Sequence, residues 1–364
     1  MTSRSGWMIY GAYGYTGVLV AEEAVRRGHR PLLAGRSAEK LAPLASRLGL
    51  ESVVLDLSDG AAMARALAKV ALVFHAAGPF VDTSDAMIRA CLETGTSYVD
   101  ITGELSVFHN TFTYDDAARK KNVVLMSGVG FDVVPTDCMA RYLSEKVPGG
   151  TELEIAIAGL GKFSAGTAKS MFDGMIVGGQ ARRGGNLVSI PIGRDVRRVR
   201  FADKERSVMA IPWGDLETAY RTTGIPNITT YMALPKNMIS ASQSTWRLRD
   251  ALAPLTRKVL AAAPVKRAVV RFLEAKVAGP DEKERGRGGS QVWAKVTDAS
   301  GRSAEAWLET IDGYAFTAVA GVRSVEKIFA HGPAGALTPA LAFGADFALE
   351  IEGTRRHDAL PSAP

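Results

Sequence analysis

The sequence predicts an α/β fold, with a doubly wound parallel sheet followed by a second α+β domain that contains a mostly antiparallel sheet. Short runs rich in Val, Ile and Leu alternate with segments of helical periodicity from residue 7 to about 145, as in βαβ units. These runs lack polar alternation, which suits strands covered on both faces. Beyond residue 150 the pattern changes to shorter strands and glycine-rich loops, which indicates a different architecture.

The elements can be placed in order along the chain. Strands are expected at 7–10, 31–34, 52–55, 71–77, 98–101 and 123–126. Helices are expected at 16–27, 37–48, 60–68, 84–94 and 111–121. Later we expect a strand at 152–160, helical segments over 246–277 interrupted by Pro254 and Pro264, a hairpin around Ser300–Gly301 and a helix over 314–329. The expected domains are 1–145 and 146–330, and a C-terminal helix within 335–352 is expected to pack back on the first.

Composition bounds the class of protein. The 364 residues are 47% hydrophobic and 23% charged, which is typical of a globular chain with a sizeable core. The net charge of +6 favours acidic partners, such as phosphorylated cofactors or anionic lipid. Cys91 and Cys138 form no CxxC pair and the histidines show no ligand spacing, so no metal site is expected. With no signal-like segment or long apolar run, we expect a cytoplasmic protein.

Three glycines at Gly11, Gly14 and Gly17 follow the first strand and open the first helix. Gly11 permits a tight turn, Gly14 lets the backbone approach a diphosphate, and Gly17 lets the helix pack closely. The helix N-terminus then offers N–H groups to the phosphates. In this βαβ context the loop predicts a Rossmann-type dinucleotide site rather than a plain turn. The expected cofactor contacts are Gly11, Ala12, Tyr13, Gly14, Tyr15, Thr16 and Gly17.

The end of the second strand distinguishes NADP from NAD. An NAD site would usually place an acidic residue there to bind the ribose 2′-OH. This chain instead has Arg36, Ser37 and Lys40. A guanidinium offers planar donors to a phosphate, and a hydroxyl can add another. NADP(H) is therefore the predicted cofactor, with the alternative that Arg36 only solvates a loop.

Loops after later strands supply further candidates. Asp56 follows the third strand, where it would contact adenine or share an N-cap with Ser58 and Asp59. The fourth strand ends in small residues that would contact the nicotinamide ribose, or that form a turn before a helix. The cofactor contacts expected here and after the sixth strand are Ala77, Gly78, Pro79, Phe80, Gly130 and Phe131.

Catalytic candidates should follow strands at the carboxyl edge of the sheet or lie in second-domain loops. Asp100, Glu104 and Asp132 fit the first condition, and Lys169 fits the second. For the three carboxylates the alternative is structural: a loop hydrogen-bond network or a helix start. Tyr142 and Lys146 form the YxxxK pattern used by short-chain reductases, but a surface pair on a helix is favoured.

Several motifs together resemble the saccharopine dehydrogenase-like oxidoreductases, a group that includes the mycobacterial trans-acting enoyl reductases. They are GAYGYTGVLVAEEAVRRG, LAGRSAEKL, AAGPF, YVDITGE and GVGFDVVPTD, with GTAKSMFDG, GPDEKERGRGG, GYAFTAVAG and LTPALAFG in the second half. The resemblance implies an NADP-binding domain, a mixed second domain and dimerisation through that second domain. It does not imply saccharopine as substrate. The enoyl reductase members are described as reducing a double bond in polyketide-derived lipid intermediates.

Two basic stretches indicate possible partners. Residues 247–276 carry Arg247, Arg249, Arg257, Lys258, Lys266, Arg267 and Arg271 among apolar residues, which suits either an anionic membrane surface or a solvated helix face. A second cluster could bind an acyl-carrier or coenzyme A phosphate, or form a solvated loop: Arg182, Arg183, Arg194, Arg197, Arg198 and Arg200. Nucleic acid is not expected, because no recognition-helix or aromatic-interleaved pattern accompanies the charge.

Three functions follow as hypotheses. The first is an NADPH-dependent oxidoreductase that acts on an enoyl, carbonyl or imine substrate, with a lipid-linked one included. The second is a non-catalytic NADP(H)-binding or membrane-associated scaffold. The third is an amino-acid dehydrogenase that acts on an imine.

Overall fold

The computed structural model describes residues 6–360, except for some side chains between residues 173 and 287. Those of Arg249 and Arg257, in the basic stretch, lie outside the described residues. The chain forms two compact units. The first unit is Met1–Val134 with Tyr314–Phe343, and the second is Pro135–Gly313 with Gly344–Pro364.

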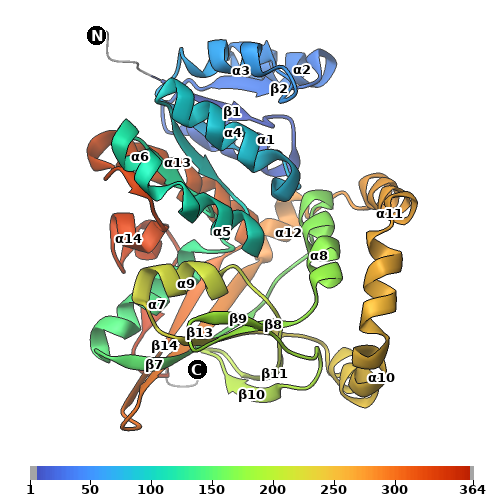
Figure 1. The fold of residues 1–364 in the computed structure, drawn as a ribbon. Coiled ribbons are helices and arrows are strands. Elements are labelled where there is room, and N and C mark those ends of the chain that lie inside the picture. Colours follow the sequence, from blue (N-terminus) through green and yellow to red (C-terminus); the bar gives the residue numbers. More distant parts are fainter. Residues whose placement is uncertain (1–5, 361–364) are drawn as a thin grey trace. The chain divides into compact units, whose positions relative to one another are not determined.

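The first unit is built on a parallel sheet, of which β1 and β2 are labelled in Figure 1. Its strand order in the described chain is β15-β6-β5-β4-β1-β2-β3. Its strands are β1 (Trp7–Tyr10), β2 (Leu32–Gly35), β3 (Ser52–Val54), β4 (Leu72–His75), β5 (Ser97–Asp100), β6 (Val124–Met126) and β15 (Gly335–Ala336). The strand order reverses between β1 and β4, so a ligand crevice is expected at their carboxyl ends. The predicted doubly wound sheet is confirmed.

Helices cover both faces of this sheet. They are α1 (Tyr15–Arg26), α2 (Ala38–Leu48), α3 (Gly60–Leu67), α4 (Phe80–Thr94), α5 (Leu105–Thr113), α6 (Asp115–Lys121), α13 (Gly313–His331) and α14 (Pro339–Phe343). Successive strand residues point to opposite faces: Ile9 and Phe74 pack with α1, α2 and α13, whereas Met8 and Val73 pack with α3, α4 and α6. This explains why the central strands are mostly apolar rather than alternating between apolar and polar residues.

Some predicted elements differ in the structure. The single helix expected at 111–121 is two helices, α5 and α6, and α4 begins at Phe80 rather than at residue 84. The helix expected within 335–352 is instead β15, α14 and the short 3-10 helix η1 (Phe347–Glu350). Residues 335–337 pair with β6 through N–H groups that donate to Val123 and Leu125, and Gly344 then takes φ +94°, which no helix accommodates.

The predicted domain boundaries at 145 and 330 fall inside the helices α7 (Val134–Lys146) and α13. The whole of α13 from Tyr314 onward groups with the first unit. The reason is a close contact with the sheet: a Cβ atom on Gly321 would lie 2.7 Å from the Phe74 ring.

The second unit contains a mixed sheet with the order β10-β11-β12-β7-β13-β14-β16 among the described strands. Its strands are β7 (Gly150–Ala158), β8 (Gln180–Arg183), β9 (Asn186–Ser189), β10 (Val196–Arg200), β11 (Glu205–Ala210), β12 (Asn227–Ala233), β13 (Gly289–Asp298), β14 (Ser303–Ile311) and β16 (Arg355–His357). β7 and β12 pair in parallel, and the other pairs are antiparallel. The predicted hairpin around Ser300–Gly301 joins β13 to β14.

The remaining helices of the second unit are α8 (Ala165–Val177), α9 (Asp215–Thr223), α10 (Lys236–Ala261), α11 (Ala263–Lys276) and α12 (Glu282–Arg287). α8, α10 and α11 contact one another. The expected interruption at Pro264 is confirmed, because this residue lies in the first turn of α11, which begins at Ala263, but α10 continues through residue 254. A search of the described helices finds none that is long and apolar enough to cross a membrane.

Candidate functional site

The glycine loop is packed backbone against backbone. Gly11 has φ +83°, and a Cβ atom there would lie 2.8 Å from the Ala77 nitrogen at the end of β4. A Cβ atom on Gly17 would lie 2.3 Å from the Gly11 carbonyl oxygen. Gly14 is extended and donates its N–H to the same oxygen at 2.9 Å. Side chains at Gly11 and Gly17 would therefore clash with the backbone of the loop and of the segment after β4, whereas the absence of one at Gly14 lets the backbone approach a diphosphate.

The start of α1 is suited to an anion. Its N-cap is Gly14, a residue without a side chain that could cap the helix. The first turn carries no acidic residue. The helix N-terminus therefore presents backbone N–H groups and a positive dipole end without a competing carboxylate.

The end of β2 carries the basic residues expected for a 2′-phosphate. Arg36 and Lys40 are exposed, and Ser37 is half-buried. Ser37 is the N-cap of α2, where its oxygen accepts the Lys40 N–H at 3.3 Å, so its own O–H can still donate. The Tyr13 ring covers Gly35, at which a Cβ atom would lie 2.5 Å from the ring, and the Lys40 ammonium lies 5.7 Å from the ring centroid.

Asp56 is exposed just beyond β3. Its carboxylate accepts hydrogen bonds from the N–H and hydroxyl of Ser58 at 2.9 and 2.7 Å. These bonds, and then the Arg36 guanidinium, hold the pKa of Asp56 below its usual range. Asp59, not Asp56, caps α3 by accepting the Ala62 N–H. The N-cap alternative for Asp56 is therefore wrong, and its contact with adenine stays a prediction.

His75 and Thr83 contact the loop after β4 through hydrogen bonds. Nε2 of the fully buried His75 lies 3.2 Å from the Ala77 carbonyl and 3.0 Å from the Thr83 hydroxyl, which donates to the same carbonyl at 2.8 Å. Burial lowers the pKa of His75 to about 4, so the ring is neutral at physiological pH. His75 is therefore a core histidine whose Nε2 has hydrogen-bond partners. The role of Thr83 could not be predicted, because its partners come from the folded loop.

Glu104 binds the end of this loop that leads into α4. Its two carboxylate oxygens accept the N–H groups of Phe80 and Val81, at 3.1 and 2.7 Å. These are first-turn amides of α4, so Glu104 caps that helix from the loop after β5. The loop beside Gly11 is thus held by hydrogen bonds with Thr83 and Glu104, and it contains the predicted cofactor contacts Ala77, Gly78, Pro79 and Phe80.

Asp100 is fully buried at the end of β5. One of its oxygens accepts from the N–H groups of Thr102 and Gly128, both at 2.9 Å, and the other accepts from the hydroxyls of Tyr98 and Ser127, both at 2.8 Å. Burial raises the pKa of Asp100 to about 6 against these bonds. The arrangement ties the loop after β5 to the loop after β6, as the structural alternative anticipates.

Asp132 lies next to this network on a half-buried stretch. A Cβ atom on Gly103 would lie 2.9 Å from its carboxylate. Burial and, second, the nearby Glu104 carboxylate raise the pKa of Asp132 to about 6. Two carboxyl groups therefore meet at the carboxyl edge of the sheet, where one holds a proton more tightly than an exposed aspartate does.

The loop after β6 packs against α13. The Phe131 N–H donates to the Thr317 hydroxyl at 3.0 Å, and a Cβ atom on Gly130 would lie 2.8 Å from the Thr317 methyl group. At the start of α13, the Tyr314 ring meets the Tyr15 ring edge-on at 4.9 Å. The sequence did not reveal that α13 borders the glycine loop, because this contact is remote along the chain.

Other candidates belong to the second unit. Lys169 is half-buried on α8, and its predicted catalytic role stays a prediction. Tyr142 donates its hydroxyl proton to Asp358, which also pairs with Lys146 at 2.9 Å. The YxxxK residues therefore form a pair on the surface of α7, as expected.

Several arginines of the predicted basic cluster form ion pairs with carboxylates of the second unit. Arg182 is buried, pairs with Glu217 at 2.9 Å and stacks over Tyr220. Arg197 pairs with Glu154 and Arg198 pairs with Glu205. Within the described chain, no group of three or more His, Cys, Asp or Glu side chains is placed to hold a metal ion.

Known proteins are similar to parts of this chain. Residues 7–126 match the family described as "Saccharopine dehydrogenase NADP binding domain". A saccharopine dehydrogenase-like oxidoreductase of Rattus norvegicus is 31% identical over 166 residues, which are 39% of this chain and 38% of that protein. A trans-acting enoyl reductase of Mycobacterium ulcerans is 31% identical over 144 residues, which are 37% of this chain and 34% of that protein. The chain therefore matches little more than a third of the length of each relative.

A solved structure agrees over a longer range. Apo histidine-tagged saccharopine dehydrogenase (L-Glu forming) from Saccharomyces cerevisiae superposes with a TM-score of 0.62, covers 95% of this chain and 96% of its own, and is 11% identical. At this identity the likeness concerns the fold. The matched range includes the glycine loop of residues 11–17 and the basic residues after β2. Residues 7–126 are therefore similar to the NADP-binding domain of saccharopine dehydrogenase, and the chain is similar to the saccharopine dehydrogenase-like oxidoreductases over little more than a third of its length.

Proposed function

We propose that this protein is an NADPH-dependent oxidoreductase that reduces an enoyl, carbonyl or imine group, with a lipid-linked enoyl compound as the first candidate substrate. The observation that carries the proposal is that three sets of residues follow strands at the same carboxyl edge of the first sheet. They are the glycine loop of residues 11–17 after β1 (the glycine cradle), the basic residues after β2, and the carboxyl pair Glu104–Asp132 after β5 and β6. The enoyl choice rests on the relatives named trans-acting enoyl reductases.

Each group has a definite task in this proposal. The amides of residues 11–17 bind the diphosphate, and Arg36, Ser37 and Lys40 bind the 2′-phosphate. NADPH, when bound, supplies a hydride. Reduction of a double bond also needs one proton, and we assign it to a carboxyl oxygen of Asp132, whose raised pKa suits proton donation. Glu104 positions the Phe80 loop and keeps Asp132 protonated to higher pH.

A turnover assay tests the proposal. NADPH oxidation is followed with crotonyl-coenzyme A as an enoyl thioester, and separately with a 2-keto acid and an amine. We expect turnover with the thioester, and a roughly 100-fold lower kcat for Asp132→Asn with unchanged NADPH affinity. Asp82→Asn, which changes an exposed carboxylate on α4, serves as the control.

The other outcomes identify the alternatives. Turnover with the keto acid and amine alone would favour the amino-acid dehydrogenase. Tight NADPH binding without turnover on either panel would favour the non-catalytic scaffold. Sedimentation of the same sample tests the homodimer that the resemblance implies.

A peripheral membrane contact is a second proposal for the basic helices. Val259 on α10 and Phe272 on α11 are 52% and 62% exposed, and each follows a basic residue, Lys258 or Arg271. Exposed apolar side chains beside cations suit an anionic lipid surface. We expect cosedimentation with phosphatidylserine vesicles that Phe272→Ser weakens, whereas Phe329→Ser, at another exposed phenylalanine, leaves it unchanged. Equal cosedimentation of both variants would contradict this contact.

A further inference from the structure

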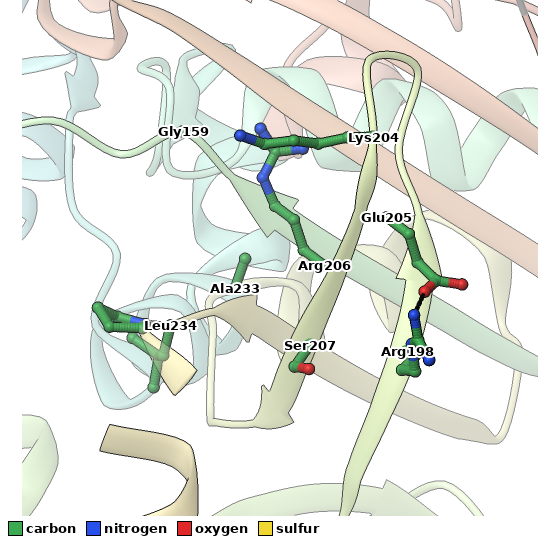
Figure 2. Close-up of a pocket in the computed structure, with 9 residues that line it drawn as sticks. Gly159, Arg198, Lys204, Glu205, Arg206, Ser207, Ala233 and Leu234 are labelled. Atoms are coloured by element: carbon green, nitrogen blue, oxygen red, sulfur yellow. Dashed lines mark ion pairs between the residues drawn. The ribbon is translucent and has the colours of Figure 1, made fainter. Parts of the chain in front are cut away.

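The second unit contains a cavity of about 540 Å³ that belongs to none of the sites above. The β10–β11 hairpin forms one side of it. The connection from β12 to α10 forms another side, and Gly159 after β7 completes the lining. Figure 2 shows the side chains of Lys204 and Arg206 extending from the hairpin toward Gly159, whereas Arg198 on β10 points toward Glu205 on β11.

The cations that line this cavity are unequally neutralised. Arg198 pairs with Glu205. Arg206 pairs with Asp203 through both guanidinium ends, at 2.5 and 2.7 Å, and stacks over Phe201. Lys204 is exposed and forms no ion pair with any described residue. One positive charge at the cavity is thus uncompensated.

The rest of the lining is polar on one side and apolar on the other. The Ser207 hydroxyl adds a donor beside Lys204 and Arg206. Ala233, Leu234 and Pro235 form an apolar wall, and Pro235 is the N-cap of the 26-residue helix α10, at which it forms no side-chain capping hydrogen bond. The dipole of a long helix adds positive potential to that already supplied by Lys204.

We infer that this cavity binds a small amphiphilic anion, an oxyanion head group on a short apolar chain. The Lys204 ammonium contacts the head group, Ser207 and the outer guanidinium N–H groups of Arg206 add hydrogen bonds, and the chain lies along Ala233 and Leu234. A phosphate monoester and a carboxylate share this chemistry. The inference does not rest on the proposed reduction, because every residue involved belongs to the second unit, whereas the glycine loop belongs to the first.

Calorimetric titration with hexyl phosphate tests the site. The intact protein is first saturated with NADPH, so that the phosphate-binding residues of the cradle are occupied. We expect saturable binding that Lys204→Ala weakens about tenfold, the factor that loss of one charged hydrogen bond implies. Lys283→Ala, at an exposed lysine on α12, should change nothing. Hexanoate in place of hexyl phosphate shows which head group is preferred.

Two results would overturn the inference. One is equal affinity of the wild type and Lys204→Ala for both anions, and the other is equally tight binding of hexanol, which lacks the charge. If Lys204→Ala should not fold, acetylation of the wild-type protein decides the question. Hexyl phosphate should slow acetylation of Lys204 and leave Lys283 unaffected, and equal protection of both lysines would refute the site.

Discussion

Gly17 lies so close to Gly11 that a Cβ atom on Gly17 would come within 2.3 Å of the Gly11 carbonyl oxygen. Gly11 is held in turn against the end of β4, where its own Cβ would lie 2.8 Å from the Ala77 nitrogen. The loop, the first helix and the fourth strand are therefore packed backbone to backbone. This packing is possible only while residues 11 and 17 are glycine.

Replacement of Gly17 by alanine should disrupt this packing. Because the nearest atoms are backbone, they cannot rotate away, and we expect a loss of about 1–3 kcal/mol in the free energy of unfolding. NADPH affinity should fall as well. Gly60→Ala is the control, because a Cβ atom at Gly60 on α3 meets nothing within 4 Å. Urea denaturation and NADPH fluorescence measure the two effects, and wild-type behaviour of Gly17→Ala in both would contradict the packing argument.

The Asp100 network should be sensitive to a change of a single atom. In Asp100→Asn an amide NH₂ would face hydrogen-bond donors that now reach a carboxylate oxygen. A buried donor without an acceptor costs about 1–3 kcal/mol, so the midpoint of urea unfolding should fall. Asp82→Asn, at an exposed site, should leave the midpoint unchanged. Equal midpoints for the two variants would show that the network contributes little.

Asp132 should give the stability a defined pH dependence. Its pKa in the folded protein is about 6, above the ordinary value of 3.8, so the folded state binds this proton more tightly than the unfolded chain does. The free energy of unfolding should therefore fall through this group as pH rises from about 4 to about 6. Asp132→Asn removes that fall, so its stability relative to wild type should improve with rising pH. Denaturation at several pH values measures the difference, and a pH-independent difference would contradict the raised pKa.

Tyr142 should not act as a catalytic acid. Its hydroxyl donates to Asp358, and the Arg356 guanidinium lies 3.5 Å from its ring centroid. Removal of the hydroxyl in Tyr142→Phe deletes a hydrogen bond on α7 and no proton donor. We expect kcat for whichever substrate turns over to remain within about twofold of wild type, with a slightly lower melting temperature. A loss of 100-fold or more would restore the short-chain reductase interpretation.

The first sheet could be predicted from sequence to within a residue or two at most strands. Strands covered on both faces read as continuous apolar runs, so β1 falls at the predicted 7–10 and β5 one residue before its predicted position. The glycine spacing and the basic residues after β2 could also be interpreted from sequence. They are local patterns, and the strand and helix that give them their meaning lie next to them in the chain.

Remote contacts could not be predicted in this way. The packing of α13 on the first sheet depends on Gly321 meeting Phe74, and helical periodicity does not say which sheet a helix covers. Likewise, Asp100 and Asp132 look alike in sequence, as carboxylates that follow strands. They differ in the structure because the donors around Asp100 come from several segments, whereas Asp132 faces the Glu104 carboxylate.

The central claim is that a guanidinium after β2 selects NADP(H) at the glycine cradle. Calorimetric titration of NADPH and NADH into the wild type and Arg36→Ala tests it most directly. Arg65→Ala, at an exposed arginine on α3, is the control. We predict tighter binding of NADPH than NADH to the wild type, and a loss of about tenfold or more in NADPH affinity, with NADH unchanged, in Arg36→Ala. Binding of NADH as tight as that of NADPH, or an Arg36→Ala variant that keeps the preference, would contradict the account.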